Sequence, residues 1–279
     1  MRRPRLRTIL LAPLLLFAAL YVFGVTVNLL DDRQVPPRSS SASPGIEEIA
    51  IFGASGTAGD GILKAALADP SVGKVHVITR RSTPRIEQGV DSGKIIMSKH
   101  LDYLDYTAVM DQLKNVQAVY WALGTSARNV DDETYSLIHV DFPVQFVKEW
   151  LEASKQSAAS FHFISSSDIS EDSSMHWARE KVRAENILFA LAEGTTLKVI
   201  AYRPDYIGPT KEESHLGQEF LYAFFAPVGA AVRARQIGEA MLDVTARGDE
   251  FSNGDKLGTG SILRYSDAYR RKPVSVAGD

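Results

Sequence analysis

The feature that most constrains the fold is a glycine-rich turn that directly follows a short apolar segment. Residues 46–52 read as a buried strand, and Gly53-Ala54-Ser55-Gly56-Thr57-Ala58-Gly59 follow at once. Residues 62–67 then show helical spacing, and residues 75–79 read as a second strand. A glycine turn between a strand and a helix indicates phosphate binding far more specifically than glycines alone do. The reason is that the helix N-terminus presents amides that lack intrahelical partners. This context predicts a turn that binds a phosphate group.

The glycines of this turn have distinct expected roles. Gly53 would permit the tight turn, Gly56 would let the backbone approach a pyrophosphate, and Gly59 would let helix and strand pack closely. Ser55 and Thr57 belong to the same turn and are expected to contact the pyrophosphate at the helix N-terminus. The sequence therefore predicts a dinucleotide site, and an ordinary strand–helix turn is the alternative.

The end of the second strand indicates which dinucleotide would bind. A carboxylate there would pair with the ribose hydroxyls of NAD(H), but Thr79 is followed by Arg80, Arg81 and Ser82. Guanidinium groups bind a 2′-phosphate through charge-assisted hydrogen bonds. We therefore predict NADP(H) in preference to NAD(H). The alternative is that these residues form a basic turn that faces solvent.

Apolar segments and helical patterns alternate along the rest of the chain. Further strands are expected at residues 95–97, 116–123, 160–164 and 197–202, and helices at residues 106–113, 133–153, 175–191 and 234–244. Such alternation predicts an α/β fold with a Rossmann-type, doubly wound parallel sheet and a ligand site at the carboxyl ends of the strands. We place this domain at residues 46–279, with a small C-terminal substrate lobe from about residue 208.

Two segments of the C-terminal third have a marked composition. Aromatic side chains gather in residues 215–225, at a spacing that favours a place in the core over a pocket wall or a membrane contact. The final stretch, with Arg264, Arg270, Arg271 and Lys272, is expected to be a solvated tail.

The first 45 residues differ from the rest. Residues 1–30 combine early arginines with an uncharged stretch of about 23 residues, enough to cross a hydrocarbon core of about 30 Å. We predict an N-terminal transmembrane helix that anchors a single-pass membrane protein, with a cleaved signal peptide as the alternative. The proline- and serine-rich residues 31–45 are expected to form a flexible linker. The arginines before the apolar stretch favour an N-terminus on the cytoplasmic side of the membrane. An arginine-rich start is also typical of a presequence that targets a protein to an organelle, which is the alternative.

The composition also excludes several classes of protein. The chain has no cysteine, which excludes disulfides, thiolate catalysis and cysteine-bound metals. A net charge of −3 gives no reason to expect nucleic acid as a partner. No histidines and carboxylates stand at metal-ligand spacing, so no metal site is predicted.

The ordered set of motifs resembles the atypical, NmrA-like branch of the short-chain dehydrogenase/reductase superfamily, and within it the Tat-interacting oxidoreductase-like group. Besides the glycine turn, the segments that carry the resemblance are Arg80-Arg81, Leu101-Asp102-Tyr103, Leu123-Gly124-Thr125, Val140-Asp141, Ser165-Ser166 and Arg203-Pro204. The resemblance implies an NADP(H)-binding oxidoreductase. It also implies that Asp102 contacts the adenine and that Leu123, Gly124 and Thr125 line the ribose and diphosphate.

The catalytic pair of that superfamily is altered here. Its members carry tyrosine and lysine four positions apart on the helix after the serine strand; the tyrosine transfers the proton, and the lysine lowers its pKa and holds the nicotinamide ribose. The matching window is Trp177-Ala178-Arg179-Glu180-Lys181, so the lysine is present and Trp177 replaces the tyrosine. An indole N–H cannot release a proton at useful pH. Either another group supplies the proton, or the chain binds NADP(H) without turnover, as a sensor or scaffold.

Four residues are candidates for the remaining chemistry. Lys181 would hold the ribose, Ser166 could bind a substrate oxygen, and His176 adjoins the lost tyrosine position; Tyr206 is a further candidate. The plain alternatives are a solvated helix face for Lys181, a strand-end cap for Ser166 and a structural histidine for His176. As an enzyme, the chain would transfer hydride between the nicotinamide and a carbonyl or alcohol of a small, apolar substrate. The oligomeric state stays open.

Overall fold

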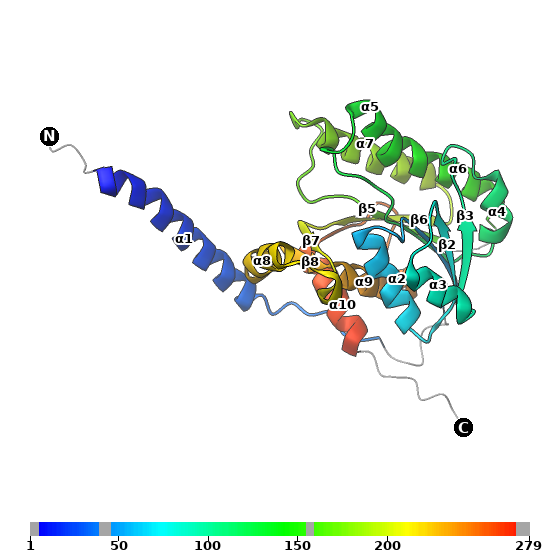
Figure 1. Cartoon of the computed structure of the whole chain (residues 1–279), viewed down its shortest axis with the longest axis horizontal. Helices are drawn as coiled ribbons and strands as arrows, with labels where there is room; N and C mark the ends of the chain where they lie inside the picture. Colours follow the sequence, from blue (N-terminus) through cyan, green and yellow to red (C-terminus); the bar gives the residue numbers. More distant parts are fainter. Residues whose placement is uncertain (1–5, 39–45, 155–158, 272–279) are drawn as a thin grey trace, which may run out of the picture.

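A seven-stranded parallel sheet forms the centre of the domain in the computed structural model, which describes residues 6–38, 46–154 and 159–271, with side chains from Pro13 onward. The strands follow the order β3-β2-β1-β4-β5-β6-β9 across the sheet (Figure 1). They are β1 (Ile46–Phe52), β2 (Val72–Thr79), β3 (Ile95–Lys99), β4 (Ala118–Trp121), β5 (Ala159–Ile164), β6 (Leu197–Arg203) and β9 (Lys256–Gly258). The predicted Rossmann-type, doubly wound α/β fold is thereby confirmed.

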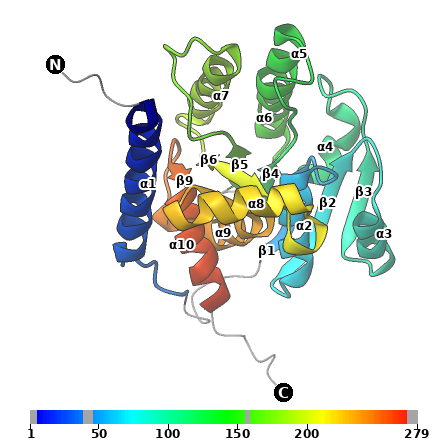
Figure 2. The ribbon, with the colours of Figure 1, turned by 60° about the vertical axis from the view of Figure 1, so that its left-hand side comes forward.

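Helices cover both faces of this sheet (Figures 1 and 2). One face carries α2 (Thr57–Ala68), α9 (Ala234–Ala246) and α10 (Thr259–Arg271); the other carries α4 (Thr107–Leu113), α6 (Phe142–Ala153) and α7 (His176–Ala192). Side chains alternate between the two faces along a strand. In β1, Ile49 and Ile51 accordingly join the first core, whereas Ala50 and Phe52 join the second.

The winding of the sheet reverses at β1. This strand pairs in parallel with β2 on one side and with β4 on the other. The crossovers that leave the two sides of such a switch point diverge, which opens a crevice at the carboxyl ends of the strands. The glycine turn, which joins β1 to α2, lies at this crevice.

Shorter elements complete the domain. Helix α3 (Pro84–Asp91) follows β2, and α5 (Asp132–Ser136) leads through a π-helical turn, η1 (Leu137–Asp141), into α6. Between β6 and α9 the chain forms the small lobe: β7 (Tyr206–Gly208), the 3-10 turn η2 (Lys211–Glu213), α8 (Leu216–Phe225), the 3-10 turn η3 (Ala226–Val228) and β8 (Ala231–Arg233). Strands β7 and β8 pair in parallel.

The end of the chain differs from the expectation of a solvated tail. After the turn η4 (Gly248–Glu250), the chain adds β9 to the edge of the sheet and continues into α10. Ile262, Ser266 and Ala268 of α10 are buried, and Arg270 pairs with Glu239 of α9 at 2.7 Å. Of the segment after β9, residues 272–279 lie outside the described residues.

The aromatic helix α8 also differs from the expectation. The spacing of residues 215–225 favoured a core position, but no residue of α8 is buried. The prediction was wrong because helical spacing shows that apolar residues share a face, and it does not show what that face meets.

The N-terminal helix α1 (Leu6–Leu30) projects from the domain (Figure 1). Its stretch Pro13–Leu30 has a mean hydropathy of 2.1 and no buried residue, so it is long and apolar enough to span a membrane. Residues 31–38 have no regular structure, as expected of a linker, yet they lie along the domain: Arg247 donates to the Pro36 oxygen at 2.6 Å, and Arg38 pairs with Asp243 at 2.9 Å. Residues 39–45, with the serine run, lie outside the described residues.

Candidate cofactor site

A cavity of about 450 Å³ opens at the carboxyl ends of β1, β2 and β4. It is lined by Gly53, Ser55, Gly56, Thr79, Arg80, Arg81, Tyr103, Ala122, Leu123 and Gly124. The structure thus brings together the glycine turn, the two arginines and the Leu123-Gly124 segment, which are far apart in the sequence.

The glycines of the turn are required by its geometry. Gly53 has a φ of 80°, and a Cβ there would lie 2.5 Å from the backbone nitrogen of Leu123. A Cβ on Gly59 would overlap the carbonyl oxygen of Gly53. Gly56 is the N-cap of α2, which has no side-chain cap, and Thr57 begins the helix. The first amides of α2 therefore keep their hydrogen-bonding capacity for a ligand.

Arg80 and Arg81 provide the positive charge of the cavity. Both side chains are exposed, and neither takes part in an ion pair among the described residues. By contrast, the nearby Arg85 pairs with Asp60 at 2.9 Å. The Thr79 hydroxyl donates to the Arg81 oxygen at 2.8 Å, which fixes the turn that carries both guanidinium groups. An anion in the cavity would meet two cations without a protein counter-charge.

At the end of β3 the structure brings Tyr103, not Asp102, to the cavity. Asp102 is exposed, and its carboxylate accepts the Leu104 amide at 3.0 Å. Tyr103 lines the cavity; burial raises the pKa of its hydroxyl, and the charge of Arg80 opposes that rise. The resemblance implies a role for the Asp102 carboxylate and none for the ring of Tyr103, which offers a flat surface to a base or ring. The contact between Asp102 and an adenine stays a prediction.

A buried histidine, missed at the level of sequence, supports the Leu123-Gly124-Thr125 segment. His139 lies on the π-helical turn η1, and its Nε2 lies 2.9 Å from the oxygen and 3.1 Å from the nitrogen of Thr125. A Cβ on Gly124 would lie 2.8 Å from the imidazole of His139. Burial and the nearby charge of Lys181 lower the pKa of His139 to about 3, so the ring is neutral. A π-turn is a signal of function, but it is not visible in a sequence.

Lys181 lies buried at the end of β5. Its Nζ donates to the Ile164 oxygen at 2.9 Å and lies 4.9 Å from the centre of the Phe163 ring. Burial lowers the pKa of Lys181 to about 8, and the carboxylate of Glu185 opposes this. The side chain is therefore not part of a solvated helix face. Glu185 in turn pairs with Arg203.

The two serines that follow β5 differ in their surroundings. The hydroxyl of Ser165 is buried and has no hydrogen-bond partner within the described ranges. Ser166, the candidate from the sequence, is half-buried. A buried hydroxyl without a partner is costly, so Ser165 joins Ser166 as a candidate contact for a ligand.

The structure places the remaining candidates among structural contacts. Nε2 of His176 lies 3.0 Å from the Ser136 hydroxyl and 3.2 Å from the Asp132 oxygen, which ties α7 to α5. Trp177 is half-buried at the start of α7. Tyr206 lies on β7 in the small lobe, with its ring 6.0 Å from that of Phe225. None of the three lines the cavity at the glycine turn.

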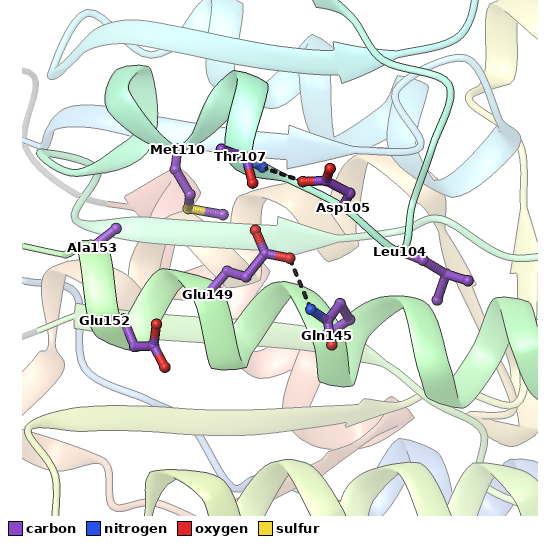
Figure 3. A pocket seen from close by; sticks show the side chains of 8 residues that line it. All are labelled: Leu104, Asp105, Thr107, Met110, Gln145, Glu149, Glu152 and Ala153. Atoms are coloured by element: carbon purple, nitrogen blue, oxygen red, sulfur yellow. Dashed lines mark hydrogen bonds between the residues drawn. The ribbon is translucent and has the colours of Figure 1, made fainter.

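A second hollow, of about 550 Å³, lies between α4 and α6 (Figure 3). It contains Asp105, Glu149 and Glu152, but two of these carboxylates already serve the backbone: Asp105 accepts the Thr107 amide at 2.9 Å, and Glu149 accepts the Tyr106 amide at 3.1 Å. It has none of the candidate residues that the sequence predicts. The cavity at the glycine turn is therefore the candidate ligand site.

Solved structures with the same arrangement of strands and helices are numerous. One is an NADPH-dependent 3-quinuclidinone reductase from Rhodotorula rubra, which is 15% identical, has a TM-score of 0.59 and matches 84% of this chain and 99% of its own. An oxidoreductase of the short-chain dehydrogenase/reductase family from Burkholderia thailandensis is 15% identical, has a TM-score of 0.59 and matches 78% of this chain and 92% of its own. The chain has the fold of the short-chain dehydrogenases and reductases.

The same fold also serves a different reaction. A UDP-N-acetylglucosamine 4-epimerase from Methanobrevibacter ruminantium is 17% identical, has a TM-score of 0.57 and matches 76% of either chain. At such identities the likeness concerns the fold.

Comparison of sequences gives a weaker signal. No profile of a known protein family matches the chain. A curated relative, the leucinostatins biosynthesis cluster protein T of Purpureocillium lilacinum, is 28% identical over 142 residues, which are 50% of this chain and 51% of the relative. The chain therefore spans about half the length of that protein.

Proposed function

We propose that the chain is an NADP(H)-dependent oxidoreductase of the atypical, NmrA-like type, anchored to a membrane and acting on an apolar carbonyl or alcohol. The observation that carries the proposal is that Arg80 and Arg81 line the same cavity as the glycine turn and have no ion-pair partner within the described part of the chain. NAD(H) has no phosphate for these cations, whereas NADP(H) has one.

The residues present fit this cofactor. The first turn of α2 offers amides to a pyrophosphate, because Gly53, Gly56 and Gly59 leave the approach free of side chains. Arg80 and Arg81 would hold the 2′-phosphate, and Leu123 and Gly124 would line the ribose and diphosphate. When bound, the nicotinamide of NADP(H) supplies or accepts a hydride.

The chain's own residues would then position the substrate and move a proton. The ammonium of Lys181 has three donors, of which Ile164 takes one, so it can hold ribose hydroxyls. Its pKa of about 8 allows proton release near neutral pH, the task that the tyrosine performs elsewhere in the superfamily. The Ser165 hydroxyl, which is buried without a partner among the described residues, would donate to a substrate oxygen.

Titration of the full chain in a nonionic detergent with NADPH and NADH, followed by nicotinamide fluorescence, tests the proposal. We expect NADPH to bind more tightly than NADH and to be consumed with at least one class in a panel of apolar aldehydes and ketones. Tight binding without consumption would favour the sensor or scaffold role that Trp177 allows. Absence of binding by the folded chain would overturn the cofactor proposal. Membrane anchoring is tested separately: the full chain should stay in the membrane fraction on extraction with alkaline carbonate.

A further inference from the structure

Helix α8 presents its apolar side to the outside of the protein. Leu216 is 91% exposed and Phe220 is 70% exposed, and Leu221 is exposed as well. The outward positions of the helix, which also include Gly217 and Ala223, carry no charge. On a water-exposed helix the apolar side faces the core, so α8 has the reverse arrangement.

The inward side of α8 combines aromatic rings with polar side chains that hold the helix in place. Glu219 accepts from the guanidinium of Arg233 at 2.6 and 2.8 Å. The same guanidinium lies 3.5 Å from the centre of the Tyr222 ring. At the start of α8, Gln218 accepts the His215 amide at 3.0 Å. These contacts fix the rotation of the helix, so its apolar side cannot turn toward the core.

Helix α1 packs directly on this lobe. The Tyr21 hydroxyl donates to the Phe224 oxygen at 2.9 Å, and the rings of Phe17 and Tyr21 stack on the ring of Phe224 at 6.3 and 5.2 Å. Asn28 donates to the Pro227 oxygen at 3.2 Å. Leu216, Phe220 and Phe224 are four residues apart and lie on one side of α8, so the apolar stripe of α8 runs into the surface of α1.

The two helices cross on one side of the domain. Figure 2 shows α8 in front of the sheet, with its axis across that of α1, and Figure 1 shows that α1 projects from this same side. The contacts from Asn28 to Phe17 run about 16 Å along α1, at about 1.5 Å per residue. This length includes the depth of about 5–10 Å to which interfacial helices bury their apolar face in the boundary between headgroups and acyl chains.

We infer that α8 lies in the lipid interface beside the membrane-spanning α1. The domain therefore contacts the near leaflet of the bilayer through α8 and is not held at the membrane by α1 alone. The partner of this surface is the phospholipid bilayer. The inference rests on the membrane anchoring proposed above, because a membrane-spanning α1 brings α8 to the bilayer. Neutral phospholipid suffices, since the outward side of α8 has no charged group.

The absence of cysteine allows a direct test in the full chain. Phe220→Cys and Leu216→Cys variants are labelled with a nitroxide and reconstituted into phosphatidylcholine vesicles. Collision of the label with oxygen and with a water-soluble nickel complex is then measured by electron paramagnetic resonance. Leu101→Cys is the matched control, because Leu101 is an exposed leucine two residues after β3. Strand β3 lies on the side of the domain away from α1 (Figure 1).

We expect labels at positions 216 and 220 to collide with oxygen and to lose collisions with the nickel complex, while the label at 101 collides readily with the nickel complex. Nickel collisions at 216 and 220 equal to those at 101 would overturn the inference. Protection from both reagents, with dipolar broadening between labels, would show a contact between two copies and would overturn it too. If the labels at positions 216 and 220 are exposed to water while the chain resists extraction with alkaline carbonate, the placement of α8 in the lipid interface is wrong. The membrane anchoring by α1 then still stands.

Discussion

Gly59 lies against Gly53 so closely that a methyl group at position 59 would overlap the Gly53 carbonyl oxygen. This contact joins the start of α2 to the end of β1 and sets the shape of the phosphate-binding turn. We expect Gly59→Ala to lower the free energy of unfolding by about 1–3 kcal/mol through overpacking and to abolish NADPH binding. Chemical denaturation and nicotinamide fluorescence measure the two effects. Gly248→Ala is the matched control, because a Cβ there meets nothing within 4 Å; equal behaviour of the two variants would contradict the role of the turn.

The preference for NADPH should depend on the two arginines at the end of β2. Each charge-assisted hydrogen bond contributes about 1.5–3 kcal/mol, so the Arg80→Ala/Arg81→Ala double variant should bind NADPH at least about tenfold more weakly. NADH binding should change little, since NADH lacks the 2′-phosphate. The control is Lys148→Ala, which removes an exposed cation of α6 that does not line the cavity. Equal losses for NADPH and NADH would show that the arginines act on the fold and not on the phosphate.

The stability of the protein should rise with pH above about 8 because of Lys181. Burial holds the pKa of Lys181 at about 8, below its value of about 10.4 in an unfolded chain. Between these values the unfolded chain binds more protons, so the folded state gains stability as the pH rises. The unfolding free energy of the parent, minus that of Lys181→Met, should increase by about 2 kcal/mol between about pH 8 and 10 and stay level below pH 8. A difference that is level throughout would refute the depressed pKa.

Acid should destabilise the protein through His139. The pKa of His139, about 3 in the folded protein, lies below the value of about 6.5 in an unfolded chain. The contribution of neutral His139 to stability is therefore fully present above about pH 6.5 and is lost as the pH falls toward 3. Buried His162 behaves in the same way, so both contribute to the parent's acid sensitivity. Relative to His139→Gln, the parent should lose about 2 kcal/mol between about pH 7 and 5. Chemical denaturation at each pH measures this. If parent and variant lose the same amount, His139 is not held neutral in the fold.

The segment after α1 should behave as part of the domain. Arg38 pairs with Asp243, which is fully buried, whereas Arg33 pairs with Asp31 and is 74% exposed. We expect Arg38→Ala to lower the free energy of unfolding by about 1–3 kcal/mol, because it removes a partner of a buried carboxylate. Arg33→Ala should leave stability unchanged, because solvent screens its exposed ion pair. Denaturation of both variants in detergent gives the comparison. Equal, small effects would indicate that residues 31–38 are detached in solution.

Local patterns predicted the first half of the domain well. Strands β1 to β6 and the helices α2, α4, α6 and α7 follow from apolar runs, turn residues and helical spacing, which act over a few neighbouring residues. Helix α3, between β2 and β3, was not predicted. The pattern failed for β9 and α10, because β9 is only Lys256–Gly258 and owes its place to pairing with β6, a contact between distant residues. The pattern also failed for α8. Apolar residues recur there at helical spacing, but the contacts of the helix place its apolar face outward.

The sequence by itself determined the glycine turn, the two arginines and the replacement of the tyrosine by Trp177, because these are matters of residue type at fixed spacing. The tertiary structure alone decided that Tyr103 and not Asp102 lines the cavity, that Lys181 is buried against Ile164, and that His139 supports Thr125. Such facts depend on the direction of a side chain and on neighbours from other elements. Burial and the resulting pKa shifts arise only when distant segments meet.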